Sequence, residues 1–124
     1  MSAELKAARP VRLQRSRRKG ARLVSPNGLP IVYVGRPSRW RNPYLVRATR
    51  TAREAVRAFR MGMRGRWAAL QQLEGHSEIN MPRVIAHFQW LRRHISELRR
   101  KNLACWCRVG EPCHAEILLE LANR

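Results

Sequence analysis

The chain has 124 residues, enough for one domain with a modest core and too few for two. Its 26 Lys and Arg against 8 acidic residues give a formal net charge of +18. This charge favours a nucleic acid or a phosphate-rich ligand as partner. A membrane is not expected, because no stretch approaches the ~20 apolar residues of a spanning helix. The basic N-terminus lacks the apolar segment of a secretory signal, which indicates a cytoplasmic protein.

The first segment is strongly basic and poor in apolar residues. Residues 1–22 predict a flexible N-terminal arm, and residues 23–124 a single α/β domain. Pro10 and Gly20 interrupt any long helix in the arm. Basic arms of this kind often bind nucleic acid. A solvated tail without a role is the alternative.

The first clear element is the apolar run at residues 31–34, which lies between turn residues. A short, β-branched run of this kind predicts a buried strand. Leu23 and Val24 predict a short partner strand before it. A loop over residues 35–44 follows, since two prolines and a glycine exclude a regular element there.

Two helical segments come next. Thr51 and Glu54 form the pattern of a capping box, and an apolar stripe at helical spacing follows. Gly62 and Gly65 weaken this helix enough to break it. Asn80 is the expected N-cap of a further helix, with a proline in its first turn.

The last two elements complete the order strand, helix, helix, strand, helix. Residues 103–107 predict a second buried strand, and a final helix is expected to begin at Glu111 and Pro112. Strands separated by helical crossovers form parallel sheets. The predicted fold class is therefore α/β, a small Rossmann-like sandwich with a short parallel sheet and about three helices.

The loops after the two strands are the expected ligand site. Ligands of parallel sheets bind beyond the carboxyl ends of the strands, so residues 35–44 and 105–114 should lie side by side. In the first loop, glycine lets a ligand approach closely, arginine and serine suit phosphate, tryptophan stacks on bases and asparagine reads a base edge. The ligand-binding candidates are Gly35, Arg36, Ser38, Trp40 and Asn42. A solvated loop with Trp40 covering the core is the alternative.

The second loop carries thiols and an imidazole. Cys107, Cys113 and His114 are the catalytic candidates, because a thiol near a helix N-terminus has a lowered pKa and an imidazole can act as a base. An enzyme with this site would be a nucleotide or base hydrolase or transferase. Zinc is an alternative that the spacing disfavours, and no other cofactor is predicted. The third reading is burial, and Cys105 is expected in the core.

Two motifs in these loops resemble a known family. The residues that carry the resemblance are Val32–Ser38, Trp40, Asn42, Pro43, Leu103–Cys107 and Pro112–Ala115. Together they resemble the uncharacterised bacterial and phage family called domain of unknown function 4326, over residues 23–123. The resemblance implies no known reaction, but it implies that the two loops are the defining segments of the family. Arg41 stands where the family pattern has glycine, and it narrows the pocket or adds a phosphate contact.

The function expected first is a nucleotide- or nucleic-acid-acting domain. A non-enzymatic nucleic-acid-binding protein is one alternative, and a phage-type effector that binds an acidic host protein is another. The nucleic-acid-binding candidates come from the arm and from the basic face of residues 82–100. They are Arg12, Arg15, Arg17, Arg18, Lys19, Arg92, Arg93, Arg99 and Arg100.

Overall fold

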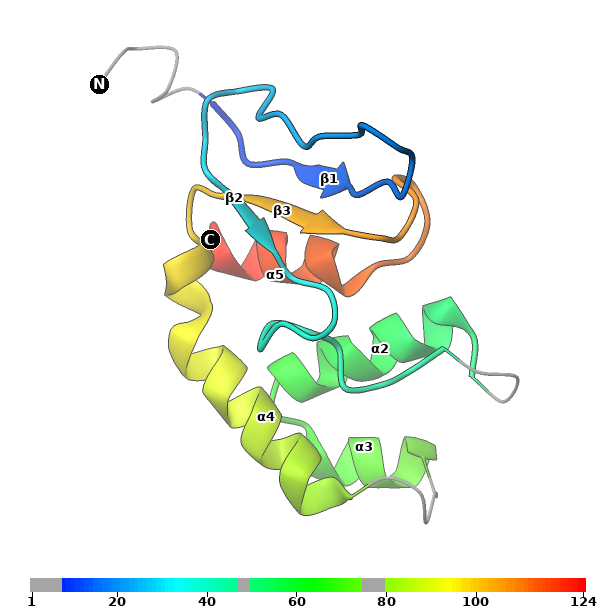
Figure 1. The fold of residues 1–124 in the computed structure, drawn as a ribbon. Helices are drawn as coiled ribbons and strands as arrows, with labels where there is room; N and C mark the ends of the chain where they lie inside the picture. Colours follow the sequence, from blue (N-terminus) through cyan, green and yellow to red (C-terminus); the bar gives the residue numbers. More distant parts are fainter. Residues whose placement is uncertain (1–7, 47–49, 75–79) are drawn as a thin grey trace.

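The computed structural model describes residues 8–46, 50–74 and 80–124 (Figure 1). Its elements are β1 (Arg12–Gln14), β2 (Ile31–Tyr33), α2 (Ala52–Met63), α3 (Trp67–Glu74), α4 (Met81–His94), the 3₁₀ helix η1 (Ile95–Leu98), β3 (Asn102–Cys105) and α5 (His114–Ala122). The predicted α/β class is confirmed. Among the described residues, no helix combines the length and the apolar character needed to cross a membrane.

The three strands form an open parallel sheet in the order β1–β3–β2. Leu103 of the central strand β3 pairs with Arg12 of β1 on one side and with Val32 of β2 on the other. Parallel strands place their carboxyl ends at one edge of the sheet. The loops after β2 and β3 therefore leave from the same edge, as the sequence predicted (Figure 1).

β1 lies inside the segment that the sequence assigned to a flexible arm. The Leu103 amide donates to the Val11 carbonyl at 3.1 Å, and Arg12 is only 8% exposed. The partner strand expected at Leu23 and Val24 is not formed, and Val24 is 75% exposed. β1 is short and charged, and its partner comes from the far end of the chain, so local propensity does not reveal it. Residues 1–7 of the arm lie outside the described residues.

Asn102, which is fully buried at the start of β3, attaches β1 and the following loop to the sheet. Its Oδ1 accepts from the Val11 amide at 3.0 Å, and its Nδ2 donates to Asn27 Oδ1 at 2.8 Å and to Ser25 Oγ at 3.2 Å. A buried amide is costly without such partners. The side chain therefore fixes the path of the chain before β2 as well as β1.

The helices carry most of the core. α2 begins with the predicted capping box, in which Thr51 Oγ1 accepts from the Glu54 amide and Glu54 Oε1 accepts from the Thr51 amide. Gly65, with φ at +69°, separates α2 from α3. The described residues consequently hold four α-helices, compared with the expected three. α2 and α4 pack through Phe59 and Phe88, whose ring centroids are 5.4 Å apart.

α5 packs against the sheet and positions the second loop (Figure 1). The helix begins at His114 with Cys113 as its N-cap, later than the expected start at Glu111 and Pro112. Its buried residues include Ile117 and Leu118. The N-terminal end of α5 thus lies beside the carboxyl end of β3, where the candidate site is found.

Candidate functional site

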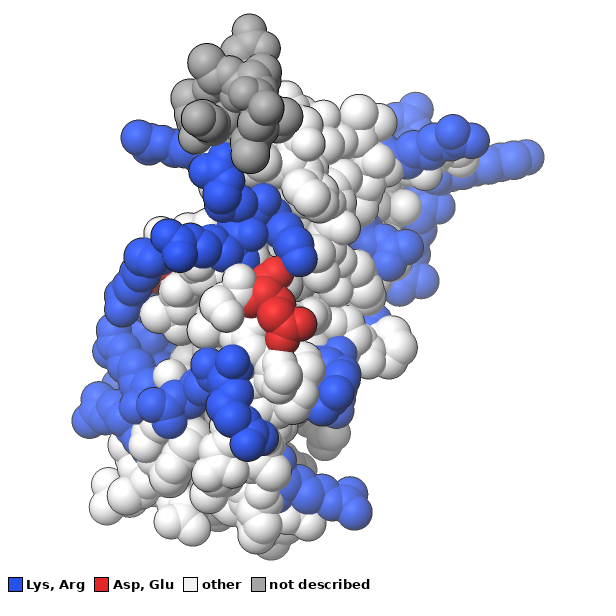
Figure 2. Space-filling model, turned by 90° about the vertical axis from the view of Figure 1, so that its left-hand side faces the viewer, with Lys and Arg blue, Asp and Glu red and all other residues white. Residues whose placement is uncertain are grey.

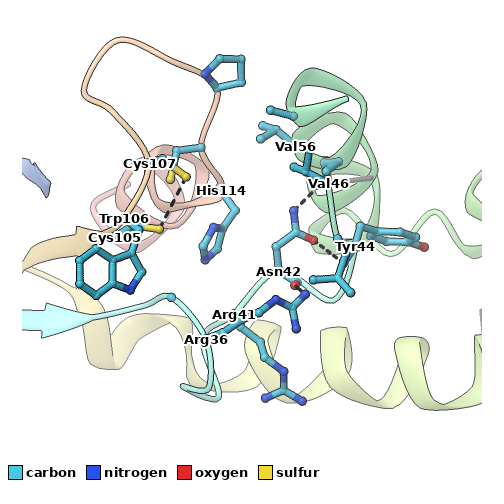
Figure 3. Close-up of a pocket in the computed structure, with 16 residues that line it drawn as sticks. Arg36, Arg41, Asn42, Tyr44, Val46, Val56, Cys105, Trp106, Cys107 and His114 are labelled. Atoms are coloured by element: carbon cyan, nitrogen blue, oxygen red, sulfur yellow. Dashed lines mark hydrogen bonds between the residues drawn. The ribbon is translucent and has the colours of Figure 1, made fainter. Parts of the chain in front are cut away.

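A cavity of about 230 Å³ opens at the carboxyl edge of the sheet, between the two loops and α2. Figure 3 shows Cys105, Cys107 and His114 on one side of it, facing Val46 and Val56 across the opening. Arg36 and Arg41 of the first loop also line it. The structure thus brings the two predicted loops together around one pocket.

The cysteines form a compact cluster in the wall of this pocket. All three are free, and the sulfurs of Cys105 and Cys107 are 3.7 Å apart. The ligand atoms of Cys105, Cys113 and His114 lie within 4.8 Å of one another. This arrangement could hold a metal ion.

The three thiols do not ionise alike. S–H donation from Cys107, and then from Cys113, lowers the pKa of Cys105. The pKa values of Cys107 and Cys113 are raised, because each donates its S–H to Cys105. For Cys107, the positive charge of Arg12 acts in the opposite direction. Cys105 therefore has the lowest pKa of the three thiols, and it lies in the core as the sequence predicted. It is 6% exposed and nevertheless lines the pocket.

His114 is buried beside the cluster. It is 7% exposed, its ring meets the Phe59 ring edge-on, and Nε2 donates to the Val34 carbonyl at 2.8 Å. Burial lowers the pKa of His114, while the hydrogen bond to Val34 acts in the opposite direction. A neutral ring that donates from Nε2 carries its lone pair on Nδ1.

The first loop is held together by its own predicted site residues. Arg36 donates to the Asn42 carbonyl at 2.6 Å, and burial, followed by the charge of Arg41, lowers the pKa of Arg36. The Asn42 side chain makes two hydrogen bonds: Nδ2 donates to the Ala55 carbonyl at 3.0 Å, and Oδ1 accepts from the Tyr44 backbone amide at 2.9 Å. Asn42 thus attaches the loop to α2. The sequence alone predicted only that Asn42 would bind the edge of a base.

Gly35 lines the pocket, and its lack of a side chain also serves packing. A Cβ at this position would lie 2.5 Å from the hydroxyl oxygen of Tyr33. The Tyr33 hydroxyl donates to the Arg36 carbonyl. The glycine therefore lets Tyr33 fold over the start of the loop.

Ser38 and Trp40 do not line the pocket. The Ser38 amide donates to the Gly35 carbonyl at 2.8 Å, which turns the chain back. Trp40 consequently packs on Trp90 of α4, with ring centroids 5.0 Å apart, and Ser38 Oγ accepts from the Trp40 amide at 2.9 Å. Trp40 covers the core, which is the alternative that the sequence left open.

Trp106 does line the pocket, together with Tyr44, and neither was among the predicted site residues. Trp106 is 36% exposed, and the guanidinium groups of Arg15 and Arg17 lie 4.7 Å and 4.6 Å from its ring centroid. An aromatic residue between two cysteines at a strand end was the available signal in the sequence.

The predicted nucleic-acid-binding residues differ in their exposure to solvent. Arg12 is not available for such contacts, because it is buried against α5 with its Nε 3.7 Å from Glu116 Oε1. The exposed candidates are Arg17, Arg18, Lys19, Arg92, Arg93, Arg99 and Arg100. Figure 2 shows that Lys and Arg cover much of one face of the molecule, while acidic side chains occupy a small part of it.

Comparison with known proteins gives a family and no individual relative. No curated protein and no solved structure matches the chain. The model of one family, described as a domain of unknown function, matches residues 13–124. The match begins inside β1, so the family domain takes in residues 13–22, which the sequence assigned to the arm. It covers nearly all of the chain, which therefore belongs to the DUF4326 family.

Proposed function

We propose that the cavity at the carboxyl edge of the sheet binds a nucleotide, either free or as one unit of a nucleic acid. The observation that carries this proposal is a pocket with an apolar wall and two arginines in its lining. A nucleobase offers an apolar face and a phosphate offers charge, so one nucleotide satisfies both parts of the lining.

The size and the walls of the cavity support a ligand of this class. Its volume of about 230 Å³ is below the roughly 300–1,000 Å³ of pockets for drug-sized ligands, and it suits a base or a nucleoside. Val46 and Val56 supply an apolar surface, and Trp106 supplies an aromatic one. Base stacking on such a ring is tolerant of sequence.

Two pairs of arginines support the phosphate part of the proposal. Arg36 and Arg41 line the cavity itself. Arg15 and Arg17 flank Trp106, beyond the cavity wall. A guanidinium matches a phosphate with two parallel hydrogen bonds, so each pair is suited to bind a phosphate.

The cysteine and histidine cluster is the metal-binding part of the same site. Zinc is the ion that we propose for it, because thiolate sulfur and imidazole nitrogen are the donors that zinc prefers.

The test is a calorimetric titration of the full chain with nucleoside monophosphates, diphosphates and the corresponding nucleosides. Arg41→Gln removes a cation from the lining, and Arg57→Gln removes an exposed cation of α2 outside it. We expect Arg41→Gln to weaken nucleotide binding about tenfold, because a hydrogen bond to a charged group is lost. Arg57→Gln should bind as the unchanged protein does. Absence of nucleotide binding in the unchanged chain would refute the proposal.

A non-enzymatic nucleic-acid-binding protein is the second candidate, and the basic face in Figure 2 favours it. For a protein of this kind, oligonucleotide affinity depends on total charge and falls steeply with salt. Arg41→Gln and Arg57→Gln would then weaken oligonucleotide binding equally, and mononucleotides would not compete. Unequal effects of the two variants would exclude this candidate.

A further inference from the structure

Two sulfur atoms of the cavity wall, those of Cys105 and Cys107, already have the spacing of a metal centre. With zinc–sulfur bonds of about 2.3 Å, two thiolates of a tetrahedral site lie about 3.8 Å apart. The sulfurs of Cys105 and Cys107 are 3.7 Å apart. Cys105 ends β3, Cys107 lies in the bend that follows it, and Cys113 is the N-cap of α5, with its sulfur within 4.8 Å of the Cys105 sulfur.

The fourth donor is oriented by a hydrogen bond of its own. A histidine that binds a metal usually donates its other ring N–H to a carbonyl or a carboxylate. Nε2 of His114 donates to the Val34 carbonyl at 2.8 Å, which leaves the lone pair on Nδ1. The donor atom of His114 lies within 4.8 Å of the sulfurs of Cys105 and Cys113. Cys113 and His114 are adjacent in the sequence, which counted against zinc, yet their donor atoms lie within 4.8 Å of each other.

The charge around the cluster provides an independent observation. Arg12 is 8% exposed, and among the described residues none of its three guanidinium nitrogens has a hydrogen-bond acceptor. Its one ion pair within the part of the chain that the structure describes, with Glu116, is long at 3.7 Å. Arg12 acts electrostatically on Cys107. Three thiolates and a zinc ion together carry a single negative charge, which balances the buried guanidinium.

We infer that the three cysteines and His114 form a closed tetrahedral zinc centre that holds the cavity wall in place. Four protein donors leave no position for water, which is the mark of a structural site. The centre joins the end of β3, the loop after it and the start of α5. It rests on the zinc proposed above, but it does not require a nucleotide.

Metal content and cobalt spectra of the full chain test the centre. We expect about one zinc per purified chain by mass spectrometry of the elements. Replacement by cobalt should give the visible bands of a tetrahedral ion and sulfur-to-cobalt charge transfer in proportion to three thiolates. A chain that takes up neither ion, or an octahedral cobalt spectrum, would overturn the inference.

Single substitutions then test the ligand set. Cys113→Ser and His114→Asn should lower zinc affinity, measured by competition with a chromophoric chelator, by at least about tenfold. His94→Asn, at a half-exposed ring outside the cluster, is the matched control and should keep the affinity. Zinc affinity that is unchanged in His114→Asn would exclude His114 as a ligand.

Arg12→Met gives a readout without touching a ligand. Loss of the balancing charge should lower the zinc affinity about tenfold, while the cobalt spectrum remains that of a tetrahedral ion. If Arg12→Met binds zinc as tightly as the unchanged protein, the charge-balance argument is wrong. Nucleotide titration of the zinc-free chain keeps the two proposals separate, because either can fail while the other holds.

Discussion

His87 links the first loop of the site to α4. Its Nε2 donates to the Arg41 carbonyl at 2.9 Å, and its ring lies edge-on to the Phe88 ring. Burial lowers the pKa of His87, and the positive charges of Arg41, Arg36 and Arg39 add to this effect. The side chain therefore positions Arg41 in the cavity lining while it remains neutral.

This contact predicts a pH dependence of stability. The pKa of His87 is below its ordinary value of 6.5 in the folded protein, so the unfolded chain takes up the proton first. Its contribution is present above about pH 6.5 and is lost as the pH falls towards the folded pKa. Glutamine can keep the donor without titrating. Urea unfolding of His87→Gln from about pH 8 to about pH 5 should show a smaller loss of stability than the unchanged chain.

The comparison at about pH 8 is the control, because both side chains are neutral there. Some loss should remain in His87→Gln, since other groups of the chain also take up protons over this range. Equal losses in both proteins between about pH 8 and pH 5 would show that His87 does not contribute.

At the scale of elements, the contact between α2 and α4 depends on one glycine. A Cβ on Gly62 would lie 2.3 Å from the ring of Phe88. That ring is fully buried and is held by the rings of Phe59 and Tyr44 at 5.4 Å and 6.4 Å. It has no space to retreat, so the glycine sets how closely the two helices approach.

Gly62→Ala is therefore expected to destabilise the protein. Alanine gains about 1 kcal/mol in helix propensity. Overpacking in a tight core costs about 1–3 kcal/mol, and the clash here is severe, so we expect a net loss of about 1–2 kcal/mol in urea unfolding. In a Phe88→Leu background the same substitution should cost less, because the smaller side chain leaves room. An equal loss of stability in both backgrounds would show that the effect of Gly62→Ala does not come from a clash with Phe88.

Elements with local signals were predictable from the sequence. The capping box of Thr51 and Glu54 starts α2 as expected, and the apolar run before Gly35 forms β2. The meeting of the two loops followed from the parallel order of the strands.

Features that depend on distant partners were not predictable. β1 becomes a strand only because it pairs with β3 and because the Asn102 side chain accepts a hydrogen bond from Val11. Trp40 turns towards α4 because Trp90 lies there, while Trp106 takes the place at the cavity. In each case the deciding contact is remote in sequence, and no local pattern encodes it.

At the scale of the whole molecule, the net charge of +18 opposes compaction. Glu120 pairs with both Arg60 at 3.4 Å and Arg124 at 3.0 Å. The 8 acidic residues are nevertheless too few to pair with the 26 Lys and Arg. Repulsion between exposed charges is screened beyond about 10 Å at 0.1 M salt. Salt should therefore stabilise the fold while it weakens binding to a polyanion.

This predicts a thermal midpoint that rises between about 10 mM and about 300 mM sodium chloride. In the double variant Arg53→Glu and Arg57→Glu, on the exposed side of α2, the rise should be smaller because the net charge is lower. The matched double variant with lysine at both positions keeps the charge and should follow the unchanged chain. Midpoints that do not depend on salt would show that the positive charges are too widely spaced to repel each other.

The strand order β1–β3–β2 also governs how the chain can be made. Within the described residues, both outer strands pair with β3, and the hydrogen-bonded residues Val11 and Asn102 are 91 positions apart. During synthesis the outer strands leave the ribosome long before the central strand exists. A chain that stalls within α4 would therefore present two unpaired strands, and unpaired edges are where growing chains associate wrongly. Assembly of the sheet, and of the cavity at its edge, has to wait until β3 and the start of α5 have been released.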